Sequence, residues 1–362
     1  LASAASAEVL SQAALLNSGT QTSAIGTQSI VANATSSAST TAALRGQIGS
    51  ALNNGNIDGA VGQIEKLRAQ EFDNYFGKKV SGNNNSISIT QVQSTLGQIS
   101  QQTGKTPAFI YVIVQPDALH LVLVTPSGKF QYRIPEANKY ILFQVVSEFR
   151  SQITDRTKLN TTSYLESAQK LYQWLIAPLE AELQAQKIDT LAFSLDPGLR
   201  SLPIAALHDG KQFLVEKYNL GLVPSANLID PSYQDIRNSP VLAMGSSEFT
   251  TVNMDALPAV PLELSTITQN IWQGKFFLNE QFTLDNLQTQ RTREPFQIIH
   301  LATHGNFQNG KPQSSYIQLW NSRLTLDRIR EMGWDKPRVE LLVLSACRTA
   351  LGDEQAELGF GG

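Results

Sequence analysis

The chain has 362 residues, of which 41% are hydrophobic and 16% charged, and its formal net charge is −3. This length and composition predict a globular protein with a sizeable core and about two domains. The slightly acidic balance and the lack of a basic cluster argue against nucleic acid as a partner. The sequence contains no run of about 18 apolar residues, so no membrane span is predicted.

Residues 1–56 consist mainly of small and polar residues, and Glu8 and Arg45 are their only charges. Such a composition buries too little apolar surface to offset the entropy of ordering. We therefore expect a low-complexity arm or linker, with short helical pieces such as "AEVLSQAALLN". An arm of this kind is suited to connect the chain to an upstream or separate sensor or regulatory module.

Residues 57–189 combine helical patterns with short strands. Helical spacing of apolar residues is found in "DGAVGQIEKLRAQEFDNYFG" and again in "SITQVQSTLGQISQQTG", where Thr90 is a candidate cap. The runs "AFIYVIV", "LHLVLVT" and "KFQYRI" are separated by turn signals and predict an antiparallel meander. Helices are predicted again in "YILFQVVSEFRSQI" and "SYLESAQKLYQWLIAPLEAELQAQ".

Residues 190–362 show strands that alternate with helical patterns. Short apolar runs occur at 190–196, 239–247, 296–307 and 339–347. Buried strands that alternate with helices predict a mostly parallel sheet flanked by helices. The expected fold class is therefore α/β, with the helical and meander region and the arm in front.

Two of these strands end in residues that carry chemistry. "IIHLATHG" places His304 and Gly305 just past an apolar run, and "LLVLSAC" places Cys347, the only cysteine, past another. Ligands bind outside the carboxyl ends of parallel strands, so neighbouring strands would bring these residues to one rim. An imidazole can take the proton of a thiol, and the N–H groups of Gly305 and Cys347 could form an oxyanion hole. The pattern predicts a Cys/His hydrolase that acts on an amide.

Other interpretations of the same residues stay open. A free cysteine is often simply buried, so Cys347 alone could serve packing. His300 and His304 have an i, i+4 spacing, but they lie on an apparent strand without a Glu or another ligand nearby, so no metal is expected. Ser345 lacks the G-x-S-x-G elbow of serine hydrolases. Neither a dinucleotide fingerprint nor a P-loop occurs, so we expect no cofactor and disfavour a plain ligand-binding domain.

The motifs around these residues resemble a known family. "IIHLATHGNF" and "LLVLSACRTALG" resemble the His and Cys motifs of the CHAT domain, a bacterial branch of the caspase–separase cysteine peptidases. The resemblance extends over "SLDPGLRSLPIAALHDGKQFLVEKYNLGLVPS", "LAMGSSEF" and "LPAVPLELSTI", in the order of the family. It implies a caspase-like core over 190–362, the N-terminal part of the family over 57–189, and a cysteine endopeptidase that cleaves a partner protein.

The resemblance also implies roles for single residues. His304 matches the catalytic base, Cys347 the nucleophile, and Gly305 the oxyanion donor that acts with Cys347. Asp196 and Asp353, the latter followed by Glu354, are candidates for lining the substrate cleft. For Asp196 the pattern favours the alternative role, which is to begin a turn before Pro197-Gly198. The other hypothesis is a catalytically silent scaffold or protein-interaction module, which the intact His-Gly and Ser-Ala-Cys motifs disfavour.

The C-terminal end departs from the pattern of the family. Family members continue past the cysteine segment through two further strand–helix units, which include the acid that most often selects Arg or Lys. Here the sequence ends at "ELGFGG", fifteen residues after Cys347. We therefore expect the catalytic core to be incomplete, and weak or no turnover from residues 1–362 alone.

Overall fold

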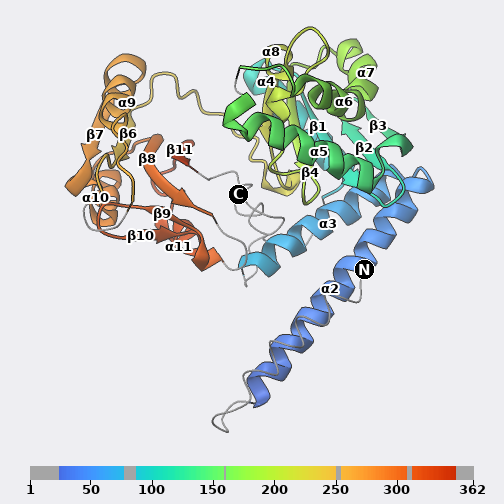
Figure 1. Cartoon of the computed structure of the whole chain (residues 1–362), viewed down its shortest axis with the longest axis horizontal. Coiled ribbons are helices and arrows are strands. Elements are labelled where there is room, and N and C mark those ends of the chain that lie inside the picture. The colour runs from blue at the N-terminus through green and yellow to red at the C-terminus, as the bar shows by residue number, and fades with distance from the viewer. Residues whose placement is uncertain (1–23, 77–86, 159, 250–253, 308–311, 348–362) are drawn as a thin grey trace. The chain divides into compact units, whose positions relative to one another are not determined.

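The computed structural model describes residues 24–76, 87–158, 160–249, 254–307 and 312–347 (Figure 1). By its internal contacts the chain divides into residues 1–46 and residues 47–362. Within the described residues the fold is α/β, as predicted, and the strands form two sheets. None of the described helices is both long and apolar enough to cross a membrane.

The N-terminal segment differs from the expected linker. Residues Ala24–Asn53 form helix α2, where composition predicted only short helical pieces. Alanine has the highest helix propensity and recurs along this segment, which accounts for a helix in a chain with few charges. Near its C-terminal end Ile48 and Leu52 are buried, and the side chain of Gln131 donates to the Leu52 carbonyl at 2.7 Å. The stretch "AEVLSQAALLN" lies outside the described residues.

The first sheet has the strand order β3-β2-β1-β4-β5. Its antiparallel part is the predicted meander, and β4 extends it by parallel pairing with β1, as β5 does by parallel pairing with β4. Strand β4 was expected in the sheet of the histidine and cysteine strands, and this expectation is wrong. Apolar periodicity identifies a strand but does not identify the strand beside it. The strands are β1 (Pro107–Val114), β2 (Leu119–Val124), β3 (Lys129–Ile134), β4 (Thr190–Leu195) and β5 (Asn219–Leu222).

Helices cover both faces of this sheet. On one face α5 and α6 share a hydrophobic cluster with Ile110 and Val112 of β1. Helix α4 also contacts β1 and β2, and its residues are not part of this cluster. Helix α4 is capped by Ser88 rather than by Thr90, because Ser88 and Gln91 form a reciprocal capping box. The helices are α3 (Ile57–Phe76), α4 (Ile89–Thr103), α5 (Lys139–Thr154), α6 (Leu165–Leu175), α7 (Glu180–Ala185) and α8 (Leu214–Lys217).

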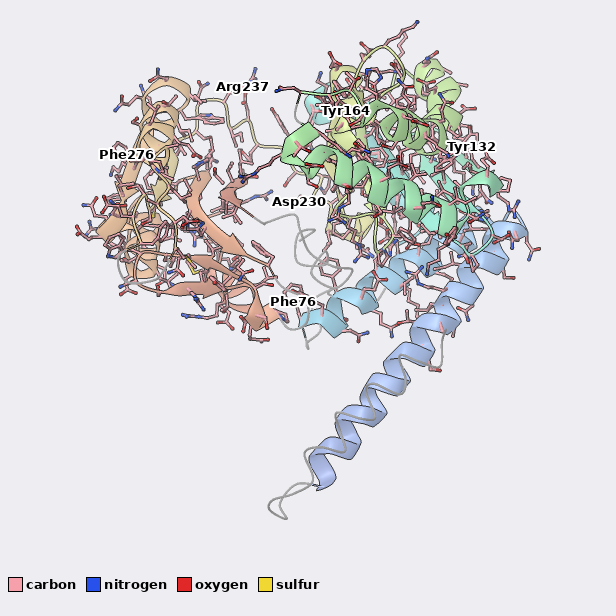
Figure 2. The ribbon with its side chains drawn as sticks, viewed as in Figure 1. Phe76, Tyr132, Tyr164, Asp230, Arg237 and Phe276 are labelled. Atoms are coloured by element: carbon pink, nitrogen blue, oxygen red, sulfur yellow. The ribbon has the colours of Figure 1, made fainter. Side chains whose placement is uncertain are left out.

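The second sheet has the order β10-β9-β8-β6-β7, and β11 pairs with β8. The strands predicted at 239–247, 296–307 and 339–347 are parallel neighbours here, with β8 between β6 and β11. Strand β7 lies at an edge and exposes Phe276 (Figure 2). The strands are β6 (Val241–Gly245), β7 (Gly274–Leu278), β8 (Ile298–Asn306), β9 (Tyr316–Gln318), β10 (Arg323–Thr325) and β11 (Leu341–Cys347).

Strands β6 and β8 are buried on both faces, as their continuous apolar runs predict. On one face Ala243 and Ala302 pack with Val260 and Leu264 of α9. The opposite face contributes to a second cluster, which includes Leu287 of α10. The helices on this sheet are α9 (Val260–Thr266), α10 (Leu284–Arg293) and α11 (Leu326–Ile329).

Replacing Gly245 by alanine should lower the free energy of unfolding by about 1–3 kcal/mol, because the new methyl group overpacks the sheet. An added Cβ would lie 2.4 Å from the Ala302 carbonyl oxygen and 2.8 Å from Val260 Cγ1. Urea denaturation measures the effect. Gly97→Ala in α4 is the control, since nothing lies within 4 Å of its Cβ, and it should leave stability unchanged or improved. If both variants unfold at the same urea concentration, Gly245 is not required for the close contact between β6 and β8.

Candidate active site

The two residues with candidate catalytic roles lie side by side in the second sheet. Strand β11 pairs in parallel with β8, and the register sets Cys347 opposite His304 at the carboxyl ends of the two strands. Neighbouring strands in a sheet are about 4.8 Å apart, and residues in register belong to the same face. The sheet therefore brings together the histidine and cysteine positions that the sequence motifs singled out.

The imidazole of His304 is held through one of its nitrogens. Its Nε2 lies 2.8 Å from the backbone carbonyl oxygen of Asp255. A carbonyl oxygen can only accept a hydrogen bond, so Nε2 carries the proton, and the neutral ring then has its lone pair on Nδ1. This contact selects the tautomer in which Nδ1 is the basic atom.

Two residues of the segment that follows β6, Phe249 and Asp255, contact this imidazole. The ring of Phe249, which is 6% exposed, has its centroid 4.7 Å from that of His304, with an angle of 50° between the planes. The Leu257 N–H donates to the Ser247 carbonyl at 2.9 Å, which draws the two ends of the segment together. Phe249 and Asp255 were not predicted as site residues. The only sequence signal for them is their place just after a strand that neighbours β8.

His300 lies on the same strand as His304, four residues earlier. It is buried, and its Nε2 is 2.8 Å from the Glu263 carboxylate on α9. This partner ties His300 to the helix above the sheet. Among the described residues, no group of three or more His, Cys, Asp or Glu side chains is arranged to hold a metal ion.

Gly305 follows His304 at the point where the pairing of β8 with β6 has ended and its pairing with β9 begins. Gly305 is buried and pairs antiparallel with Ile317 of β9. Just before it, the Thr303 hydroxyl donates to the Gln318 carbonyl at 2.6 Å. These contacts fix the backbone directly after the histidine, which is the position proposed for an oxyanion donor.

The structure does not bring Asp196 to this rim. Asp196 follows β4 in the first sheet, is 2% exposed, and accepts hydrogen bonds from Arg68 Nη2 and the Val114 N–H, each at 2.8 Å. Its carbonyl accepts the Leu199 N–H at 3.0 Å, and Gly198 has φ 86°. This is the geometry of a type II turn, so the contacts favour the turn role of Asp196. Asp353 and Glu354 lie outside the described residues.

Arg68, on α3, and Asp196, after β4, belong to a buried network of ion pairs. Arg68 is fully buried and also pairs with Glu71 at 3.2 Å, while Arg200 pairs with the same carboxylate. Burial alone would lower the pKa of Arg68, but Glu71 and Asp196 raise it above its ordinary value. Each of these buried charges thus has an opposite charge beside it within the fold.

A parallel sheet with a histidine and a cysteine on neighbouring strand ends is the arrangement expected of the caspase-like class. The family model of the CHAT domain matches residues 165–362, which is more than half of the chain. The chain therefore belongs to the CHAT domain family, as the motifs predicted. The match includes β4 and β5 of the first sheet as well as the second sheet. A comparison with curated proteins gave no match.

Proposed function

We propose that the protein is a cysteine endopeptidase of the CHAT type, which cleaves a partner protein with His304 and Cys347 as its catalytic pair. The observation that carries the proposal is the β8–β11 register, which sets these two residues next to each other at the carboxyl ends of parallel strands. Membership of the CHAT family supports the peptidase class.

In the proposed reaction, Nδ1 of His304 takes the proton of the Cys347 thiol. The thiolate attacks the carbonyl carbon of the scissile peptide bond, and the N–H groups of Gly305 and Cys347 stabilise the oxyanion. The imidazolium then gives its proton to the leaving amine, and the C–N bond breaks to leave a thioester. Water, deprotonated by His304, hydrolyses the thioester, releases a carboxylate product and regenerates the thiol.

The contacts of His304 suit this role. When Nδ1 gains a proton, the ring becomes a cation that still donates from Nε2 to the Asp255 carbonyl. The Asp255 carbonyl thus holds the ring in the same orientation in both protonation states. The ring of Phe249 restricts rotation of the imidazole. Asp255 and Phe249 are in this view positioning residues for the base.

The proposal is tested with peptidyl acyloxymethyl ketones that differ in the residue before the reactive carbonyl. These probes need only the thiolate attack, so they report on the site even where turnover is slow. We expect at least one probe to form a covalent adduct at Cys347, detected by intact-protein mass, and none in Cys347→Ala. The reference is the same chain unfolded in urea. If the folded chain reacts no faster than the unfolded one, the scaffold or interaction module replaces the peptidase.

A further inference from the structure

A second buried arginine, Arg291 on α10, lies in the catalytic half of the chain. It is 4% exposed, yet its hydrogen bonds go to backbone carbonyls rather than to a carboxylate. Nη1 donates to the Met332 carbonyl at 2.7 Å, and Nη2 donates to those of Gly333 and Pro337 at 2.9 and 3.3 Å. One guanidinium thus closes the loop between α11 and β11.

This loop has further contacts that depend on its closed shape. The guanidinium carbon of Arg291 lies 4.6 Å from the centroid of the Trp334 ring, whose Nε1 donates to the Ile329 carbonyl at 2.6 Å. The Trp334 carbonyl accepts the Val339 N–H at 2.7 Å. The loop is therefore wrapped around the guanidinium up to the residues that directly precede β11.

Arg291 is placed between the beginnings of both catalytic strands. Helix α10 leads directly into β8, which carries His304, and the loop that it holds leads into β11, which carries Cys347. At the entry point, the Gln297 carbonyl accepts the N–H groups of Glu340 and Leu341 at 2.9 and 3.1 Å. From there the two strands run in register up to the pair of His304 and Cys347.

The register at this entry point decides where Cys347 lies. A slip of one residue moves a strand by about 3.3 Å and turns its residues to the other face of the sheet. Strand β11 has β8 as its partner, and among the described residues no second strand pairs with it. The contacts at the entry point are among those that set its register against β8.

An apolar side chain would stabilise this part of the fold at a lower cost in desolvation than a buried cation. Burial indeed lowers the pKa of Arg291, and Asp335 only partly opposes this effect. What an apolar residue lacks is the planar fork of donors that selects one arrangement of several carbonyl groups. The contacts of Arg291 thus favour a role in defining the shape of the loop.

We propose that Arg291 is a positioning residue for the catalytic pair, which fixes the register at which β11 enters the sheet beside β8. This inference rests on the proposed function of His304 and Cys347. It assigns to Arg291 no contact with substrate.

The test separates alignment from binding in the reaction of Cys347 with its best acyloxymethyl ketone probe. In Arg291→Lys we expect the maximal inactivation rate to fall about tenfold or more, since small misplacements of reacting groups are costly. The half-saturating probe concentration should change by no more than about twofold. Arg291→Ala should lose the rate in the same way, and N-ethylguanidinium should restore it by filling the vacated site. Arg293→Lys, an exposed position on the same helix, is the matched control and should react as the wild type does.

Two results would overturn the inference. One is a folded Arg291→Lys variant with the wild-type inactivation rate. The other is a guanidinium compound that restores the melting temperature of Arg291→Ala without restoring the rate, because this would show a role in stability alone. If the proposed function itself is wrong, the wild-type protein already differs from expectation, because its Cys347 then reacts with the probe no faster than an ordinary thiol.

Discussion

Replacement of His304 by alanine should slow the alkylation of Cys347 by a peptidyl acyloxymethyl ketone, in which the thiolate displaces the carboxylate leaving group, by about 10²- to 10⁴-fold, the usual contribution of a general base. The expectation follows from the register that pairs the two residues and from the Asp255 contact that leaves Nδ1 as the basic atom. The second-order rate constant of adduct formation, followed by mass spectrometry near neutral pH, measures the effect.

His300 supplies the matched control for this experiment. It is a histidine on the same strand, but its imidazole is paired with Glu263. His300→Gln keeps a group that can donate to this carboxylate, so the rate should stay within about threefold of the wild type. An unchanged rate in His304→Ala, or an equal loss in both variants, would contradict the assignment of His304 as the base.

Replacement of Arg68 by methionine should lower the free energy of unfolding by about 3–5 kcal/mol, the usual cost of removing one partner from a buried ion pair. Arg68 is fully buried and lies 2.8 Å from the Asp196 carboxylate and 3.2 Å from that of Glu71. Methionine would fill much of the volume and leave both carboxylates without this cation. Urea denaturation of the two proteins at the same pH measures the difference.

Arg237, which is labelled in Figure 2, forms an exposed pair with Asp235, and this pair provides the control. Arg237→Met should change stability by less than about 0.5 kcal/mol, because solvent screens such pairs. Asp196→Asn keeps an acceptor for the Val114 N–H, and combined with Arg68→Met it should cost less than the sum of the single variants. If Asp196→Asn instead weakens the binding of basic probes while stability is unchanged, Asp196 lines the substrate cleft.

Much of the fold follows from local patterns. The meander of β1, β2 and β3 is visible in the sequence because turn signals separate short β-branched runs. The assignment of β4 to the first sheet is not visible, since β4 and β8 have the same apolar pattern and pairing is decided by long-range contacts. Helix α2 was not predicted because low charge and low hydrophobicity are shared by loose arms and by alanine-rich helices.

The juxtaposition of His304 and Cys347 was predictable for a different reason. His304 and Cys347 each follow an apolar strand, and parallel strands bring their carboxyl ends to one edge. Phe249 and Asp255 contact His304 through a ring and a backbone carbonyl, and Arg291 donates to loop carbonyls. None of these contacts has a local signature in the sequence. For Asp196 the local sequence was partly misleading, because an acid at the end of a strand is typical of a residue that lines a cleft. Its ion pair with the buried Arg68 is a long-range contact that the sequence does not reveal.

The most direct measurement is the pH dependence of Cys347 carbamidomethylation by iodoacetamide, which needs no knowledge of the substrate. Cys347 is the only cysteine, so the rate reports on a single thiol. We expect an apparent thiol pKa below the ordinary value of about 8.5, and its return to that value in His304→Ala. A thiol that titrates at or above about 8.5 in both proteins would contradict a working His304–Cys347 pair.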